Sequence, residues 1–240
     1  MSIVSIVGKK RSGKDTTADI LVKEFGAVKY ALATPIKLAL HHAYNETRAY
    51  HKCGVHLSFH DIDGSTEYDR ESQLILSNSD VIDLMTKALE FLKNGFNLKS
   101  ININDWAESG VLYDRKIISE NSEPWSVRRL MQLLGTDIVC NFIDTQFWNR
   151  CMVQKYISEF DKNPNVIFII TDVRQQHELD FIRKLGAKMI FIERPSINNC
   201  TKDTHITEAG LLRKSIDPLI VNDGSLDDLR KQILNLFRGN

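Results

Sequence analysis

The sequence has no net charge and no long apolar run. Its 240 residues include 31 basic and 31 acidic side chains, whereas proteins that bind a nucleic-acid polymer or an acidic membrane surface usually have a basic excess. No apolar run approaches the ~20 residues of a membrane-spanning helix, and the N-terminus enters an apolar stretch directly, without a leader. We therefore expect a soluble cytoplasmic protein that has neither a nucleic-acid polymer nor a membrane as partner.

Cysteine is scarce and shows no paired spacing. The four cysteines are Cys53, Cys140, Cys151 and Cys200. Scattered cysteines of this kind are typical of free thiols in a reducing compartment. Three histidines, His51, His56 and His60, accompany Cys53, but their spacing matches no closed four-ligand zinc site. Ordinary loop histidines are the interpretation that we favour.

The strongest motif is a glycine-rich loop near the N-terminus. Gly8 is followed after four residues by Gly13 and Lys14, the spacing of a phosphate-binding loop, although Asp15 stands where serine or threonine usually follows the lysine. A β-branched run precedes the loop, and residues with helical spacing follow it as far as Gly26. This order brings backbone N–H groups and the positive end of a helix to one point, where a polyphosphate binds. The alternative is a glycine-rich turn without a ligand.

Strand and helix patterns alternate along most of the chain. Strands are expected at about 3–7, 28–32, 166–170, 188–193 and 219–221, and helices at about 80–94, 126–138, 144–160, 176–185 and 226–236. This alternation predicts an α/β fold of the P-loop NTPase type with a doubly wound, mostly parallel sheet. We expect one domain over residues 1–240, with an inserted α+β segment at about 45–122 and a lid-like loop at about 195–214.

Charged residues follow the predicted strands at the edge where open α/β sheets bind ligands. Asp172 comes directly after a buried strand, where phosphate-loop enzymes place a carboxylate that acts on the magnesium shell, and Arg174 follows it. Arg194 comes directly after the next strand. With Lys14, these two arginines would neutralise the charge that moves in phosphoryl transfer.

A second polar set lies on the helix predicted after Ser126. Arg128, Gln132 and Thr136 fall at steps of four, with Arg129 beside them. Such a face suits a phosphate and the edge of a base, although an ordinary solvated face has the same spacing. Lys37, near the start of another helix, is expected to face outward, as a solvated lysine or as a substrate ligand.

Asp15 has three interpretations. Its carboxylate could hold magnesium, Thr16 could do so with a shifted geometry, or Asp15 could act as a general base. An alcohol acceptor needs a base, but a phosphate monoester does not, because its second pKa of about 6 leaves it mostly ionised at neutral pH. We favour the magnesium role, with Thr16 and Asp172 as the other candidate metal ligands.

Several blocks of sequence match a known family. They are residues 10–19, 68–71, 125–132, 135–137, 172–175, 203–210 and 222–226. On these blocks the chain closely resembles the deoxynucleoside monophosphate kinases of T-even bacteriophages. The resemblance spans nearly the whole chain, departs most at about 45–122 and 144–165, and includes Asp15 in the family pattern.

The resemblance implies an enzyme that uses ATP and Mg²⁺ to convert deoxynucleoside monophosphates to diphosphates for DNA precursor synthesis. It also implies a homodimer, in the host cytoplasm if the chain is of phage origin. The implied ATP-binding residues are Arg11, Ser12, Gly13, Lys14, Asp15, Thr16, Thr17 and Asn222, the last of them near the adenine. The predicted substrate-binding residues are Lys10, Lys37, Arg70, Arg128, Arg129, Gln132, Gly135, Thr136, Trp148 and Arg174. The predicted catalytic residues are Lys14, Asp15, Arg128, Asp172, Arg174 and Arg194.

Two other functions remain as alternatives. A kinase of another small phosphorylated acceptor, such as a phosphomevalonate-type enzyme, shares the Gly-Lys-Asp loop, but Trp125, Trp148 and the Gln132 amide favour a flat base. An ATP-driven switch would need a partner-facing signature, and the sequence contains neither a guanine-reading Asn-Lys-x-Asp nor a transporter-type Ser-Gly-Gly.

Overall fold

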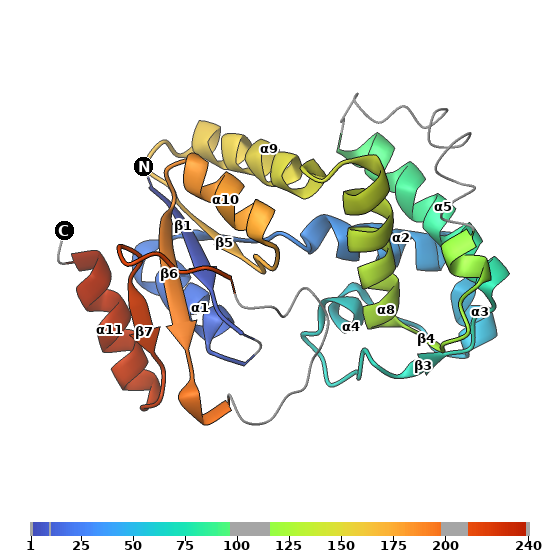
Figure 1. Ribbon diagram of the computed structural model, residues 1–240, viewed down its shortest axis with the longest axis horizontal. Helices are drawn as coiled ribbons and strands as arrows, with labels where there is room; N and C mark the ends of the chain where they lie inside the picture. Colours follow the sequence, from blue (N-terminus) through green and yellow to red (C-terminus); the bar gives the residue numbers. More distant parts are fainter. Residues whose placement is uncertain (1, 10, 97–115, 198–210, 239–240) are drawn as a thin grey trace. The chain divides into compact units, whose positions relative to one another are not determined.

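The computed structural model describes residues 2–9, 11–96, 116–197 and 211–238 (Figure 1). The chain divides into two compact units, and the first consists of Met1–Leu32 together with Met152–Asn240. The second unit is the continuous segment Ala33–Cys151, so the segment predicted as an insertion, at about 45–122, lies inside it.

A five-stranded parallel sheet organises the first unit. Its strands are β1 (Ser2–Val7), β2 (Val28–Ala31), β5 (Ile167–Thr171), β6 (Lys188–Glu193) and β7 (Leu219–Val221), in the spatial order β2-β5-β1-β6-β7. Strand β1 is central, since Val4 lies opposite Ile169 in β5 and Lys188 in β6. The predicted α/β fold of the P-loop NTPase type, with its mostly parallel sheet, is confirmed.

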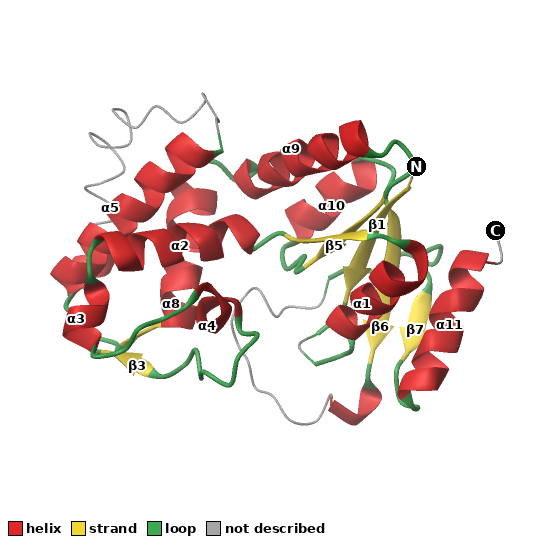
Figure 2. Ribbon diagram, turned by 180° about the vertical axis from the view of Figure 1, so that it is seen from behind, coloured by secondary structure: helices red, strands yellow, loops and turns green. Residues whose placement is uncertain are grey.

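Helices cover both faces of the sheet (Figure 2), and alternate residues of β1 belong to two different cores. Val4 and Ile6 belong to a core with helices α1 (Lys14–Phe25) and α11 (Leu226–Arg238). Ile3 and Val7 belong to a core with α10 (Gln176–Lys184) and with the part of α9 (Phe147–Lys162) that follows Cys151. Burial on both faces explains why β1 is mainly aliphatic, with Ser2 and Ser5 as its polar residues, because each buried aliphatic side chain contributes roughly 1.5–3 kcal/mol.

Helices make up most of the second unit. They include α2 (Thr34–Glu46), α3 (Ala49–Cys53), α4 (Phe59–Asp63), α5 (Asn78–Gly95) and α8 (Val127–Gln132), beside a short antiparallel pair of β3 (Gln73–Leu74) and β4 (Trp125–Ser126). Helix α5 begins at a capping box, in which Ser77 Oγ accepts from the Asp80 N–H and the Asp80 carboxylate accepts from the Ser77 N–H. Its buried residues share one core with Leu40 and Ala43 of α2.

The helix predicted after Ser126 forms but changes its pitch. Ser126 Oγ accepts a hydrogen bond from the Arg129 N–H (3.2 Å), which caps α8. From Leu133 to Ile143 the chain continues as a π-helix. A π-helix forms i→i+5 hydrogen bonds in place of the i→i+4 bonds of an α-helix, so Thr136 lies in a segment of different pitch from the one that holds Arg128 and Gln132.

Cys53, Cys140 and Cys151 are buried free thiols, as predicted, and Cys200 lies outside the described residues. Within the described part of the chain, no cluster of three histidine, cysteine, aspartate or glutamate side chains is placed to hold a metal ion. None of the described helices combines the length and the apolar character needed to cross a membrane.

Candidate active site

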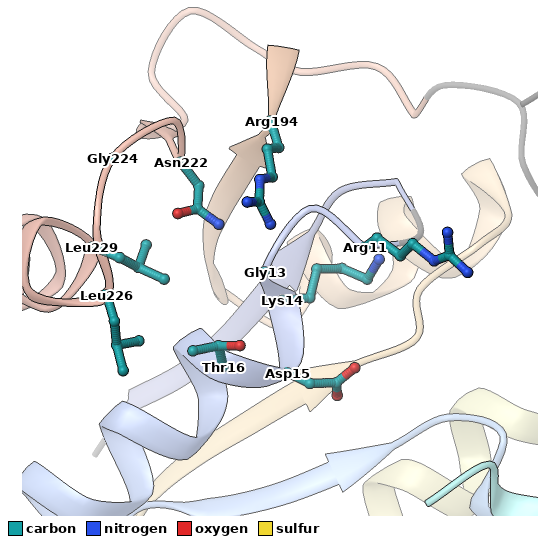
Figure 3. A pocket seen from close by; sticks show the side chains of 10 residues that line it. All are labelled: Arg11, Gly13, Lys14, Asp15, Thr16, Arg194, Asn222, Gly224, Leu226 and Leu229. Atoms are coloured by element: carbon teal, nitrogen blue, oxygen red, sulfur yellow. The ribbon is translucent and has the colours of Figure 1, made fainter. Parts of the chain in front are cut away.

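A pocket of about 310 Å³ opens in the first unit at the carboxyl end of the sheet (Figure 3). The loop after β1 and the first turn of α1 form one wall, and the residues that follow β6 and β7 form the other. The lining residues are Arg11, Gly13, Lys14, Asp15, Thr16, Arg194, Asn222, Gly224, Leu226 and Leu229. The structure thus brings together seven of the residues predicted from the sequence.

The two glycines of the predicted phosphate loop, Gly8 and Gly13, are each required for a different structural reason. A Cβ on Gly8 would lie 2.4 Å from the carbonyl oxygen of Ile192, so the loop can lie directly against β6 only with glycine there. Gly13, the N-cap of α1, has a φ of 105°, in the left-handed region that glycine adopts without strain. Arg11 is also left-handed, with a φ of 65°, and such strained backbone is common at functional sites.

Cations predominate in the pocket lining. Among the described lining residues, Arg11, Lys14 and Arg194 are basic and Asp15 is the single carboxylate. The Lys14 ammonium donates hydrogen bonds to the carbonyls of Gly8 (2.5 Å) and Lys9 (2.7 Å), and so lies over its own loop. Because the N-terminus of α1 adds a partial positive charge at the same place, the pocket suits a polyphosphate.

Asp15 lies at the entrance of the pocket and is paired with a lysine. Its side chain is 74% exposed, and Lys29 Nζ on β2 lies 3.1 Å both from Asp15 Oδ1 and from Asp19 Oδ1. Partial burial lowers the pKa of Lys29, but the two carboxylates raise it more, and the net pKa is above its ordinary value. The Asp15 carboxylate and the Thr16 hydroxyl are oxygen ligands of the kind that Mg²⁺ prefers, and both line the pocket. The residues present therefore fit the predicted metal.

Asp172 and Arg174 occupy the turn that follows β5, outside the pocket lining. Asp172 is left-handed, with a φ of 61°, and its Oδ1 lies 3.8 Å from Arg174 Nη2. The turn is held by Glu178, whose Oε2 accepts from the N–H groups of Arg174 (2.9 Å) and Gln175 (3.0 Å). Burial raises the pKa of Glu178, although these two N–H groups act in the opposite direction.

Apolar residues of the pocket were not predicted from the sequence. Leu226 and Leu229 line the pocket from α11 beside Gly224. Leu226 is 63% exposed, but a leucine at the start of an amphipathic helix has the spacing of a core residue, so no signal in the sequence indicated its place in the pocket. Glu178 was missed as well, although Gln175 and Glu178 have the spacing of a capping box.

Two predicted acceptor residues are adjacent in the second unit. The Arg128 N–H donates to the carbonyl of Arg70 (3.0 Å), and Arg128 Nε lies 3.1 Å from Glu71 Oε1. The Arg70 guanidinium donates in turn to the carbonyls of Ile62 (3.4 Å) and Asp63 (3.3 Å). The structure thus joins α8 to the segment after α4 through two arginines.

Lys37 does not face outward, and that prediction was wrong. It is only 7% exposed, and its Nζ lies 2.6 Å from Asp63 Oδ1. The other carboxylate oxygen of Asp63 accepts from Ser65 Oγ (2.6 Å). Partial burial raises the pKa of Asp63, but the hydrogen bonds from Lys37 and Ser65 lower it more, and the net pKa is below its ordinary value.

Two tryptophans in the described part of the second unit, Trp125 and Trp148, belong to its core. Trp148 is 3% exposed and its indole N–H donates to the Gly135 carbonyl in the π-helix (3.0 Å). Trp125 is also 3% exposed and donates to Asn78 Oδ1 (2.9 Å). Arg129 stacks its guanidinium over the Trp125 ring at 5.1 Å from the ring centre.

The other residues predicted for the site lie in the phosphate loop, in α1, in the helix after Ser126 or outside the described residues. The side chains of Ser12, in the loop, and Thr17, in α1, are buried, and neither hydroxyl has a hydrogen-bond partner among the described residues. Gln132 ends α8, and Thr136 lies in the π-helix. Lys10 lies outside the described residues, as does most of the predicted lid-like loop.

A family model described as "Deoxynucleotide monophosphate kinase" matches residues 2–233. The chain belongs to this family. A deoxynucleotide monophosphate kinase of Enterobacteria phage T4 is 38% identical over 99% of both chains, and one of Escherichia phage RB69 is 37% identical over 99% of this chain and 100% of its own length. A putative deoxynucleotide monophosphate kinase of Acanthamoeba polyphaga mimivirus is 32% identical over 45% of this chain and 59% of its own. The predicted family is confirmed, and the protein is a kinase.

Proposed function

We propose that this family member transfers the γ-phosphate of ATP to deoxynucleoside 5′-monophosphates, giving deoxynucleoside diphosphates and ADP. The observation that carries the proposal is the cationic pocket at the N-terminus of α1, where Lys14 and Arg194 line the walls beside a left-handed Gly13. Phosphoryl transfer requires mainly positioning and neutralisation of charge on the moving group, which these residues would provide.

The pocket of the first unit is the proposed donor site. Lys14 would leave the carbonyls of its own loop and bind the β- and γ-phosphates, while the backbone N–H groups at the start of α1 would hold the remaining phosphate oxygens. Leu226 and Leu229 offer an apolar wall to the adenine, beside the Asn222 amide. Arg194 would cover the charge that develops on the transferred group.

Asp15 and Thr16 would hold the metal of the donor. Bound Mg²⁺ would neutralise charge on the β- and γ-phosphate oxygens. The Lys29 ammonium, 3.1 Å from Asp15 Oδ1, would keep the exposed carboxylate close to the start of α1. Asp172 would act as a more distant carboxylate from the neighbouring strand end.

Arginines of the second unit are the proposed acceptor ligands. Arg128, with 14% of its side chain exposed, and Arg70 would hold the phosphate of the monophosphate, and Gln132 and Thr136 would meet the base and sugar. Trp148 would act through the Gly135 carbonyl that it holds. The zero net charge supports small nucleotides rather than a nucleic-acid polymer as partners. A homodimer in the host cytoplasm completes the proposal, on the strength of the family resemblance.

Coupled measurement of ADP formation tests the reaction. ATP and Mg²⁺ are supplied with each deoxynucleoside monophosphate in turn, and with no acceptor. We expect ADP formation to depend on one or more of the monophosphates and to stop when Mg²⁺ is chelated. ADP formation at the same rate without an acceptor would contradict the proposal and indicate an ATP-driven switch instead.

A further inference from the structure

Asn222 joins three separate parts of the first unit. It follows β7 directly, and its backbone N–H donates to the carbonyl of Glu193 at the end of β6 (2.8 Å). Its side-chain Nδ2 donates to the carbonyl of Ser12 in the phosphate loop (2.9 Å). One residue therefore ties the loop after β1 to the strand end that leads into Arg194 (Figure 3).

The bond to Ser12 fixes the orientation of one peptide group. The Ser12 carbonyl and the Gly13 N–H belong to the same planar trans peptide, so they point in opposite directions. An amide that holds the carbonyl on one side consequently directs the Gly13 N–H to the other side. Glycine rotates easily about φ, and without such a bond this peptide is free to turn over.

Close packing strengthens the same restraint. A Cβ on Gly13 would lie 2.4 Å from Asn222 Nδ2, so the amide rests directly on the backbone of this residue. Gly13 has a φ of 105° and is the N-cap of α1, where the first N–H groups of the helix have no partner within it. A donor that bonds the Ser12 carbonyl also polarises the peptide and makes its N–H a stronger donor.

We infer that Asn222 is a positioning residue for the phosphate loop, acting through the Ser12–Gly13 peptide rather than through the base of the nucleotide. The inference rests on the proposed donor site. Its consequence is that Asn222 affects every polyphosphate to the same degree, with or without a base. A residue that contacts adenine would instead affect only nucleotides.

Inorganic tripolyphosphate separates the two roles, because it has the phosphates of ATP and no base. Calorimetry would measure the Kd of ATP and of tripolyphosphate, at one Mg²⁺ concentration, for the wild type, Asn222→Ala and Asn222→Asp. We expect Asn222→Ala to weaken both ligands by the same factor, roughly three- to tenfold, the effect of one lost hydrogen bond. Asn222→Asp keeps the shape but places a carboxylate against the Ser12 carbonyl, so both affinities should fall further, again together.

Leu226→Ala is the matched control, since Leu226 lines the same pocket without a bond to the loop. It should weaken ATP and leave tripolyphosphate unchanged. If the Asn222 variants weaken ATP alone, or neither ligand, the positioning role is wrong. If the wild type binds neither ligand, the donor site itself is wrong and the inference falls with it. Asn222→Leu, which keeps about the size of asparagine and adds no charge to the pocket, makes the same comparison if Asn222→Ala does not fold.

Discussion

Replacement of Asp63 by asparagine tests the ion pair that the sequence did not reveal. The Lys37 side chain is 9% exposed and that of Asp63 is 33% exposed, with 2.6 Å between Nζ and Oδ1. At an effective dielectric constant of about 20, two unit charges at this separation attract by about 6 kcal/mol. Desolvation of the two ions offsets several kcal/mol of that attraction, and the amide still accepts one hydrogen bond. We expect Asp63→Asn to lower the free energy of unfolding by about 2 kcal/mol, and Asp63→Ala by roughly 3–5 kcal/mol.

Urea unfolding followed by tryptophan fluorescence is the suitable assay, because Trp125 and Trp148 are buried in the unit that contains the pair. A loss of about 2 kcal/mol corresponds to a fall in Tm of roughly 4–8 °C for a chain of this size. ATP affinity is the control and should not change, because the donor pocket lies in the first unit. The double variant Lys37→Met/Asp63→Asn leaves no unpaired buried charge. Its loss of unfolding free energy should therefore be smaller than the sum of the losses in Lys37→Met and in Asp63→Asn.

The pH dependence has a definite sign. The pKa of Asp63 in the folded protein is below its ordinary value of 3.8, so the pair stabilises the protein fully above that pH. Its contribution is lost as the pH falls below 3.8 and through the folded-state value. The difference between wild type and Asp63→Asn should therefore be constant from neutral pH down to about 5 and shrink below 3.8. A variant within 0.5 kcal/mol of wild type at pH 7, or strict additivity in the double variant, would refute the reasoning.

Three further predictions concern the proposed site. Asp15→Asn should raise the Mg²⁺ concentration needed for half-maximal rate without changing the shape of the pH–rate profile; loss of one limb of that profile with an unchanged Mg²⁺ requirement would favour a general base. Arg128→Lys removes the two-pronged guanidinium grip, so kcat/KM for the monophosphate should fall about ten- to a hundredfold while the KM for ATP stays within twofold; equal damage to both substrates would contradict an acceptor role. Gly8→Ala places a Cβ 2.4 Å from the Ile192 backbone oxygen, and thermal unfolding should show a loss of about 1–3 kcal/mol; unchanged stability would mean that the loop does not lie against β6.

Local patterns were sufficient to predict the first unit. The three inner strands, β5, β1 and β6, are short aliphatic runs buried on both faces, whereas the edge strands β2 and β7 are partly exposed. Helices α1 and α10 end near Gly26 and Gly186. The phosphate loop needs only its own spacing and these neighbours. Because the loop would bind phosphate through the backbone of one short segment, a short sequence motif is enough to predict it.

Partners distant in sequence could not be predicted in this way. Lys37 lies on the buried side of α2, three residues before Leu40, and the carboxylate that compensates its charge is that of Asp63, 26 residues later in the sequence. The π-helix after Leu133 differs from an α-helix in backbone hydrogen bonding, which the apolar spacing does not record. Asn222 bonds to a carbonyl 210 residues away, and no local pattern in either segment indicates that contact.

The strand order of the sheet also determines when the enzyme can fold during its synthesis. Strands β1 and β2 leave the ribosome first, yet β5 lies between them and β6 lies on the other side of β1. At ~5–20 residues per second, translation takes roughly ten to forty seconds to reach the end of β6 at Glu193. The second unit, Ala33–Cys151, is complete before then and has all its residues available to fold. Until β5 and β6 have been made, the mainly apolar strand β1 has no partner strand on the nascent chain. It is therefore the segment that a chaperone would protect most from aggregation.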